Sequence, residues 1–210
     1  VRSSAASVVY KRQENPVLYL LHGIGGDEEA WMDLGRASQI LDNLIAQGKA
    51  KPMIVVMTNG NISQEAAPGQ TSDNLIVPTL GLPKTMEGSF EVSFPEVVKF
   101  VDARYRTLAN SQNRAIAGLS MGGFHSLYIS INNPKTFGYV GLFSAAIGKE
   151  QRSDGANEYI YDNLDDKLAN LFAAKPKLFW IGIGNSDFLY KDNNAFRKKL
   201  DSKGYKYIYM

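Results

Sequence analysis

The stretch Gly118-Leu119-Ser120-Met121-Gly122-Gly123 decides how the middle of this 210-residue chain folds. The apolar run Arg114–Gly118 leads into it and predicts a buried strand. Behind it, residues 124–131 repeat apolar side chains at helical spacing, and Pro134 lies just beyond the end of that predicted helix. Glycine has no side chain to clash where the backbone turns sharply from strand to helix. We therefore expect Ser120 at the tip of a tight turn, with its hydroxyl exposed at the carboxyl end of a sheet.

A serine in this setting has the features of a nucleophile. The pattern Gly-x-Ser-x-Gly between a strand and a helix is the nucleophile elbow of hydrolases that form a serine ester. Ser120 would also lie at a helix N-terminus, whose dipole favours the negative charge that develops during attack on a carbonyl. The backbone amide of Met121 is then the first predicted donor to that oxyanion.

A second glycine-rich segment, Leu20-Leu21-His22-Gly23-Ile24-Gly25-Gly26-Asp27, follows the apolar run Pro16–Leu21. Its glycines let the backbone come close to a substrate, and the amide of Ile24 is the second predicted oxyanion donor. His22 lies in the loop that leaves this strand. We interpret it as a residue that orders the turn through hydrogen bonds, in preference to a catalytic base.

The third segment, Gly182-Ile183-Gly184-Asn185-Ser186-Asp187, leaves a later apolar run. In this type of site the chain order is serine, then an acid, then histidine. Asp187 is therefore the predicted acid of a catalytic triad. The alternative is that Asp187 only caps the next helix, and Asp192 is the nearest competing carboxylate.

The catalytic base has only two candidates, because the chain holds only two histidines. His125 follows Ser120 inside the predicted helix and should point into the helix packing, away from the serine. The order rule places the base after the last predicted strand, Tyr205–Tyr209, and the sequence stops at Met210. We hypothesise that the catalytic histidine follows Met210 in the parent protein, about one loop length further on.

The rest of the chain alternates short apolar runs with amphipathic stretches, which predicts an α/β fold with a mostly parallel central sheet and helices on both faces. The strands, expected to be buried on both faces, are 16–21, 52–57, 114–118, 139–143, 178–182 and 205–209. The helices are centred on 40–45, 94–105 (with Ser93 as its N-cap), 124–131, 164–172 and 196–200. Residues 1–210 form one predicted domain. Asn59–Val92 is predicted to be a functional loop over the site, or else a surface insertion, and Val1–Asn15 an edge strand with a polar loop.

Composition excludes several classes of function. Lys and Arg number 23 and Asp and Glu 21, and this near balance argues against nucleic acid or an acidic membrane as the main partner. The absence of cysteine excludes a disulfide scaffold, a thiolate nucleophile and cysteine-bound metals. No apolar run reaches the roughly 18 residues of a membrane span, and no signal peptide is visible. We expect no metal and no organic cofactor, and the sequence does not indicate an oligomeric state.

Taken together, Leu20–Asp27, Gly118–Gly123 and Gly182–Tyr190 resemble the esterase D-like branch of α/β hydrolases. The resemblance is greatest to feruloyl esterases and acetyl xylan esterases of bacterial xylan-degrading systems. It implies the α/β-hydrolase fold, hydrolysis of ester side groups on plant cell-wall polysaccharide, and a secreted or periplasmic location. That family has a Gly-Gly-His segment after its last strand and a β-hairpin before its first buried strand. This sequence matches neither, so we expect it to be trimmed at both ends.

The resulting hypothesis is acyl transfer to water through an ester of Ser120, with a histidine as base that Asp187 orients. Trp31 and Asp33 are predicted to line the substrate, although Trp31 could equally be a structural anchor. Rival substrates for the same fold are S-formylglutathione and a siderophore lactone, and an acyltransferase could use the same elbow. A rival of another class is a non-catalytic module that binds a saccharide or acyl ligand.

Overall fold

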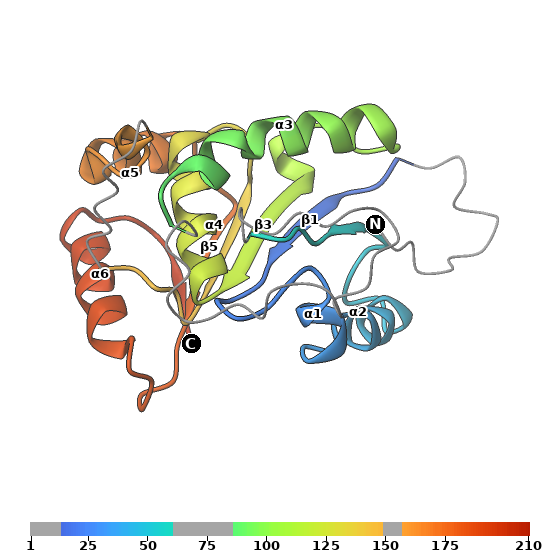
Figure 1. The fold of residues 1–210 in the computed structure, drawn as a ribbon, viewed down its shortest axis with the longest axis horizontal. Helices are drawn as coiled ribbons and strands as arrows, with labels where there is room; N and C mark the ends of the chain where they lie inside the picture. The colour runs from blue at the N-terminus through green and yellow to red at the C-terminus, as the bar shows by residue number, and fades with distance from the viewer. Residues whose placement is uncertain (1–13, 61–85, 149–156) are drawn as a thin grey trace.

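The computed structural model describes residues 14–60, 86–148 and 157–210, and in them six strands form one parallel sheet (Figure 1). The strand order is β2-β1-β3-β4-β5-β6. The strands are β1 (Val17–Leu21), β2 (Ile54–Val56), β3 (Arg114–Leu119), β4 (Tyr139–Phe143), β5 (Leu178–Gly182) and β6 (Ile208–Tyr209). Each predicted strand is present, and the last is shorter than the apolar run that indicated it.

Helices cover both faces of this sheet, as the sequence predicted. They are α1 (Ala30–Asp33), α2 (Ala37–Ala46), α3 (Ser89–Arg104), α4 (Met121–Asn132), α5 (Leu164–Ala173) and α6 (Tyr190–Ser202). Figure 1 shows α3 and α5 on one side of the strands and α1 and α2 on the other. Phe179 of β5 contacts both Phe172 of α5 and Phe196 of α6, so α6 packs on the same face as α5.

The order of the strands reverses at β1. The chain runs from β1 outward to β2 and then returns to β3 on the other side of β1. Right-handed crossovers therefore send the two connections to opposite faces, which opens a crevice outside the carboxyl ends of β1 and β3. Leu21 is paired with Gly118 in the parallel register, so the loops that follow these two strands start side by side.

The two faces of the sheet are buried to different extents. On the face under α3 to α6, the following strand side chains are at most 2% exposed: Tyr19, Ile116, Val140, Leu142, Phe179 and Ile181. On the other face, the following alternate residues are only half-buried: Leu18, Ala115, Ala117, Tyr139, Phe143 and Trp180. The prediction of burial on both faces is therefore wrong for β3, β4 and β5. Apolar composition indicates a strand in a sheet, but it does not report whether a helix covers each face.

Helix α3 starts earlier than predicted. Gly88, with a φ of 94°, precedes its first residue, whereas Ser93 lies inside the helix and its Oγ donates to Phe90 O at 3.0 Å. Ser93 is therefore not the N-cap. The predicted loop Asn59–Val92 consequently ends at Gly88; its residues 61–85, and residues 1–13 of the predicted edge strand, lie outside the described residues. Burial of the Phe90 and Phe94 rings explains the extra turn.

A buried ion pair ties α3 to the start of β3. Arg114 Nη2 lies 2.6 Å from Asp102 Oδ2, and Arg114 Nη1 donates to Thr136 O at 3.1 Å. Thr107 Oγ1 donates to the other carboxylate oxygen of Asp102 at 2.7 Å. Nearby, burial raises the pKa of Tyr19 to about 12. This network fixes the amino end of the strand whose carboxyl end carries Ser120.

Candidate active site

Ser120 lies at the sharp turn that the sequence predicted between β3 and α4. Its backbone has φ 54° and ψ −110°, a conformation that residues with a side chain rarely adopt. Its amide donates to Phe143 O at 2.9 Å, and its carbonyl accepts from the amides of Phe124 and Ala146, both at 3.0 Å. Three backbone hydrogen bonds to β4, α4 and the segment after β4 therefore hold the serine in place.

The glycines of the elbow are required by close backbone contacts. A methyl group on Gly122 would lie 2.3 Å from Leu21 O, and one on Gly118 would lie 2.3 Å from the carbonyl of Gly122. Neither distance is possible between real atoms without a shift of the backbone. The start of α4 therefore packs directly on the ends of β3 and β1, which brings the elbow into the crevice between these strands.

The segment after β1 also reaches Ser120. A methyl group on Gly23 would lie 3.6 Å from Ser120 Cβ and 3.4 Å from Leu119 O, so the Gly23 backbone runs beside the nucleophile. The amide of Gly26 closes this turn by donating to Gly23 O at 3.1 Å. Ile24 follows Gly23 and Met121 follows Ser120, so both predicted donor segments meet at one place. The donor roles of these two amides stay predictions.

His22 orders this loop, as the sequence analysis interpreted it. The side chain is buried; its Nδ1 donates to Gly23 O at 2.8 Å and its Nε2 accepts from Gly60 N at 2.9 Å. These two bonds require the neutral ring with its proton on Nδ1. Burial lowers the pKa of His22 below its ordinary value, which favours that neutral form. Since both ring nitrogens are engaged, His22 joins the loop after β1 to the loop after β2.

Asp187 lies in the loop between β5 and α6, and one of its oxygens caps the turn into that helix. Its Oδ1 accepts from Leu189 N at 2.8 Å, and its carbonyl accepts from Tyr190 N at 3.0 Å. The alternative capping role is therefore present. Because a carboxylate has two oxygens, capping through one is compatible with orienting a histidine through the other. The competitor Asp192 lies within α6, against Gly148.

Neither histidine reaches the predicted triad within the described part of the chain. His22 makes the bonds given above, and His125 Nδ1 lies 2.8 Å from Glu91 Oε1, buried in the packing of α4 as predicted. Met210 pairs with β5, donating to Ile181 O at 3.1 Å and accepting from Ile183 N at 3.2 Å. The last residue of the sequence therefore lies at the edge of the sheet from which the Asp187 loop departs.

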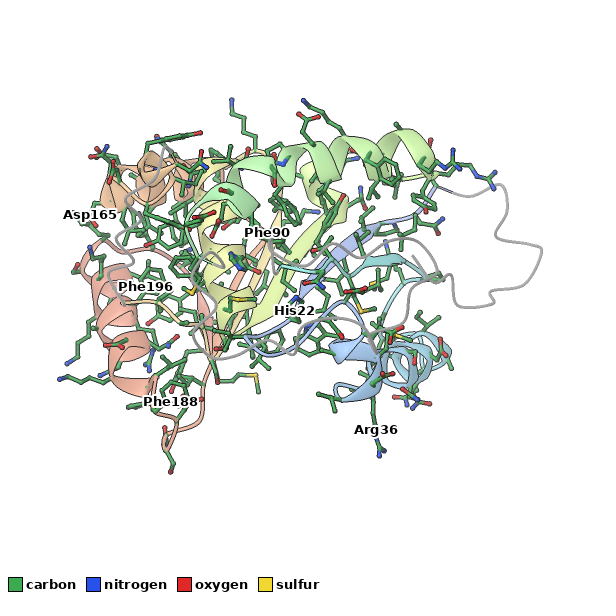
Figure 2. All side chains as sticks on the ribbon, in the orientation of Figure 1. His22, Arg36, Phe90, Asp165, Phe188 and Phe196 are labelled. Carbon is green, nitrogen blue, oxygen red and sulfur yellow. The ribbon has the colours of Figure 1, made fainter. Side chains whose placement is uncertain are left out.

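The two predicted substrate-lining residues lie on α1. Trp31 Nε1 donates to Leu21 O at 2.8 Å, and its ring meets Phe143 edge-on at 5.8 Å, so Trp31 anchors α1 on the sheet. Asp33 is exposed. Their contact with a substrate stays a prediction. Phe188, directly after Asp187, is 82% exposed and projects from the outside of the fold (Figure 2).

Sequence reasoning missed Glu91, whose carboxylate is buried beneath the elbow. A signal for it was present. Glu91 lies three residues before Phe94 and seven before Val98, so it falls on the apolar stripe of its helix, where a charge is not expected. A buried carboxylate is costly unless it is paired, so an acidic residue on a buried stripe predicts a buried partner. In the structure that partner is His125.

The described residues contain no group of three or more His, Cys, Asp or Glu side chains placed to hold a metal ion. No helix within residues 14–60, 86–148 and 157–210 is both long and apolar enough to cross a membrane.

Comparison with known sequences gives consistent matches. A family model described as putative esterase matches residues 7–202. An endo-1,4-β-xylanase/feruloyl esterase of Xylanibacter ruminicola is 40% identical over 159 residues, which are 75% of this chain and 20% of that protein. An esterase of Mycobacterium tuberculosis is 33% identical over 133 residues, 62% of this chain and 24% of that protein. This chain thus spans less than a quarter of the length of either relative.

Solved structures share the fold. A ferulic acid esterase of Anaeromyces mucronatus, determined in complex with ferulic acid, superposes with a TM-score of 0.72 at 22% identity, covering 95% of this chain and 72% of that one. An S-formylglutathione hydrolase of Staphylococcus aureus superposes with a TM-score of 0.63 at 20% identity, covering 97% and 78%. Both likenesses establish the architecture that surrounds Ser120.

Proposed function

Because this chain belongs to the putative esterase family, we propose that it is the core of a serine carboxylic-ester hydrolase acting on ester side groups of plant cell-wall polysaccharide. One observation carries the proposal. Ser120 is held in a strained backbone conformation at the crevice of the sheet, with the Gly23 backbone beside its Cβ. Strain of this kind is maintained where a side chain must be presented for chemistry.

The geometry supports a two-step acyl transfer. Ser120 Oγ attacks the ester carbonyl carbon while a histidine takes its proton, and the Ile24 and Met121 amides hold the oxyanion. The bond to the alcohol then breaks, and the histidine returns the proton to the departing oxygen. Water, activated by the same histidine, releases the acid and regenerates Ser120. No metal or organic cofactor takes part in this scheme.

The scheme needs a base, and both histidines of this chain are engaged elsewhere. We place the base on a segment that follows Met210 in the parent protein. Two observations support this placement. Met210 lies beside Ile183 at the sheet edge that leads to Asp187, and the fold's chain order puts the histidine after the acid. Asp187 would then orient that histidine.

The substrate is proposed to be a feruloyl or acetyl ester of xylan. The Xylanibacter relative is named as a xylanase and feruloyl esterase, and the Anaeromyces structure is that of a ferulic acid esterase holding ferulic acid. Xylan is a polymer of the plant cell wall, so an enzyme acting on it must work outside the bacterial cytoplasm. We therefore propose a secreted or periplasmic location.

The test uses the parent protein with three esters: methyl ferulate, an acetylated xylo-oligosaccharide and S-formylglutathione. We expect hydrolysis of one of the first two, and loss of about 10⁶-fold in kcat for Ser120→Ala, the cost measured for a triad serine elsewhere. Preference for S-formylglutathione would keep the mechanism and overturn the substrate.

A non-catalytic binding module is the second candidate, favoured by the engagement of both His22 and His125 away from Ser120. It predicts a parent protein that hydrolyses none of the three esters. It also predicts that Ser120→Ala leaves the affinity for a feruloylated oligosaccharide unchanged, as measured by calorimetry. Detectable hydrolysis that Ser120→Ala abolishes would exclude this candidate.

A further inference from the structure

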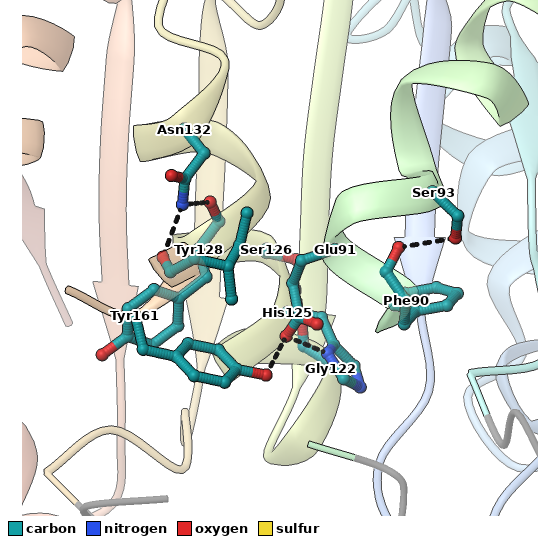
Figure 3. Close-up of polar contacts among 10 residues, drawn as sticks. Phe90, Glu91, Ser93, Gly122, His125, Ser126, Tyr128, Asn132 and Tyr161 are labelled. Atoms are coloured by element: carbon teal, nitrogen blue, oxygen red, sulfur yellow. Dashed lines mark hydrogen bonds and ion pairs between the residues drawn. The ribbon is translucent and has the colours of Figure 1, made fainter. Parts of the chain in front are cut away.

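A buried polar pair lies beneath the elbow, among aromatic rings. Glu91 of α3 and His125 of α4 are each 1% exposed, and His125 Nδ1 lies 2.8 Å from Glu91 Oε1. Tyr161 Oη donates to the same carboxylate oxygen at 3.2 Å (Figure 3). The rings of Phe90 and Phe124 lie 4.7 and 5.9 Å from the His125 ring. Burying such groups costs stability, and apolar residues of similar volume often replace a buried pair without loss.

His125 lies close to Met121, whose amide is one of the two predicted oxyanion donors. His125 is four residues after Met121, so both side chains lie on one face of α4. A methyl group on Gly60 would lie 3.5 Å from Met121 Cε, 3.7 Å from His125 Nε2 and 3.6 Å from His22 Nε2. Gly60 therefore lies between the two histidine rings, and its amide donates a hydrogen bond to His22.

These contacts form a continuous chain from α3 to the nucleophile. Glu91 binds His125, the His125 ring lies beside Gly60, the Gly60 amide donates to His22, and the His22 ring binds Gly23 O beside Ser120 Cβ. Within the described residues, His125 Nε2 and Glu91 Oε2 are buried without a hydrogen-bond partner.

We propose that Glu91 and His125 are positioning residues that set the oxyanion loop relative to Ser120. The inference rests on the proposed function. The Met121 amide is part of α4, whereas the Ile24 amide belongs to a separate loop, so their separation depends on what joins the two. By fixing the His125 ring against Gly60, Glu91 fixes the His22 loop that carries Ile24. A misplacement of about 1 Å in a catalytic arrangement can lower the rate by about a hundredfold.

The kinetic test compares variants of the parent protein on an aryl ester. Glu91→Leu is expected to lower kcat by tenfold to a hundredfold with KM changed less than threefold, per folded molecule, because only an interaction with the transition state is disturbed. Glu91→Gln is expected to retain most of kcat, since its amide oxygen can accept from His125 Nδ1. Unchanged kcat for Glu91→Leu would overturn the proposal.

A second variant covers the case in which Glu91→Leu does not fold. His125→Asn keeps an N–H donor near the position of Nδ1 for Glu91 but removes the ring edge that faces Gly60. It should lose kcat as Glu91→Leu does, and full activity would contradict the proposed contact. Two matched controls are expected to keep kcat within about twofold. Tyr161→Phe removes the other bond to Glu91, and Ser130→Ala removes a buried hydrogen bond on α4 to Leu127 O.

A readout independent of activity separates this inference from the proposed function. Amide hydrogen exchange in the 210-residue chain reports the Gly60 and Gly26 bonds directly. Glu91→Leu should speed exchange at both amides at least tenfold relative to core amides of β3, and Tyr161→Phe should not. If the wild-type parent protein hydrolyses no ester while these amides respond, the proposed function fails and the positioning contact stands. Unchanged exchange refutes the contact itself.

Discussion

Ser120 carries a backbone conformation that glycine adopts without strain and serine does not. Its φ of 54° and ψ of −110° are held by hydrogen bonds to Phe143, Phe124 and Ala146. A non-glycine residue in such a region costs on the order of 1–3 kcal/mol, which the surrounding structure must supply. The backbone conformation that exposes the Ser120 hydroxyl therefore lowers the stability of the folded protein.

This strain predicts a stabilising substitution at the nucleophile. Ser120→Gly relieves the backbone strain but loses more chain entropy on folding than Ser120→Ala does. The net effect should be a free energy of unfolding about 1 kcal/mol higher for Ser120→Gly than for Ser120→Ala. Both variants lack the hydroxyl, so they differ in strain, in chain entropy and in one methyl group. Urea unfolding of the two proteins measures the difference. A Ser120→Gly protein less stable than Ser120→Ala would show that the turn is not strained.

His22 predicts a loss of stability in mild acid. Burial is the largest cause that lowers its pKa, and the electrostatic effect of the neighbouring His125 acts in the same direction. The Gly23 bond and the carboxylates of Asp27 and Glu28 oppose them. In the unfolded chain His22 binds a proton near pH 6.5. The folded form resists that proton, so the contribution of His22 is complete above about pH 6.5 and falls as the pH drops towards the lowered folded value.

The matched control is His22→Gln, which does not titrate. Its deficit in unfolding free energy against the wild type should be largest at about pH 8 and should narrow by about pH 5, because protonation in the unfolded chain penalises only the wild type. Urea unfolding across this pH range gives both curves. A constant deficit would mean that His22 has the same pKa in the folded and unfolded chain.

Among the elements, α3 connects the two ends of β3. Near its start, Glu91 contacts His125 beneath the elbow, and near its end Asp102 holds Arg114 at the first residue of β3. The Arg114 side chain is 7% exposed and that of Asp102 23%. The same helix also carries an exposed pair, Glu96 and Lys99, 2.6 Å apart. Two ion pairs on one helix thus differ mainly in burial.

That contrast predicts unequal costs of substitution. Asp102→Ala leaves the Arg114 guanidinium buried without its partner and should destabilise the protein by about 3–5 kcal/mol. Glu96→Ala should cost less than about 1 kcal/mol, because an exposed pair is screened by water. Chemical denaturation of both variants checks the comparison. Equal costs would mean that burial does not decide the strength of these pairs.

At the scale of the whole molecule, the strand order β2-β1-β3-β4-β5-β6 gathers the catalytic candidates at one edge of the sheet. The loops after β1 and β3 meet at Ser120, and the loop after β5 carries Asp187. The predicted family resemblance and the predicted α/β fold are both confirmed, by the match over residues 7–202 and by the parallel sheet. The roles of the individual site residues stay predictions.

This arrangement predicts how the 210-residue chain behaves alone. It should fold, but it should hydrolyse an aryl ester about 10⁶-fold more slowly than the parent protein, which is the cost of a missing triad histidine elsewhere. Steady-state rates of both proteins on 4-nitrophenyl acetate measure the ratio, with Ser120→Ala of each as the background. Equal rates would return His22 or His125 to the mechanism as the base.

The sequence alone determined the features that neighbouring residues decide. The turn at Ser120 follows from the local sterics of Gly118–Gly123, and the strand before it follows from the short apolar run Arg114–Gly118. The helix starts were less predictable. Burial of Phe90 makes α3 begin at Ser89, before the predicted N-cap Ser93, and that burial depends on residues remote in sequence.

Only the tertiary structure decided which distant residues meet. The hydrogen bond of Gly60 to His22, the position of Gly60 beside His125 and the pair that Glu91 forms with His125 join residues 34 to 65 positions apart. Such contacts depend on strand register and on which face of the sheet each helix covers. The pattern of apolar and polar residues along the chain specifies neither the register nor the face, so these contacts could not be predicted from the sequence.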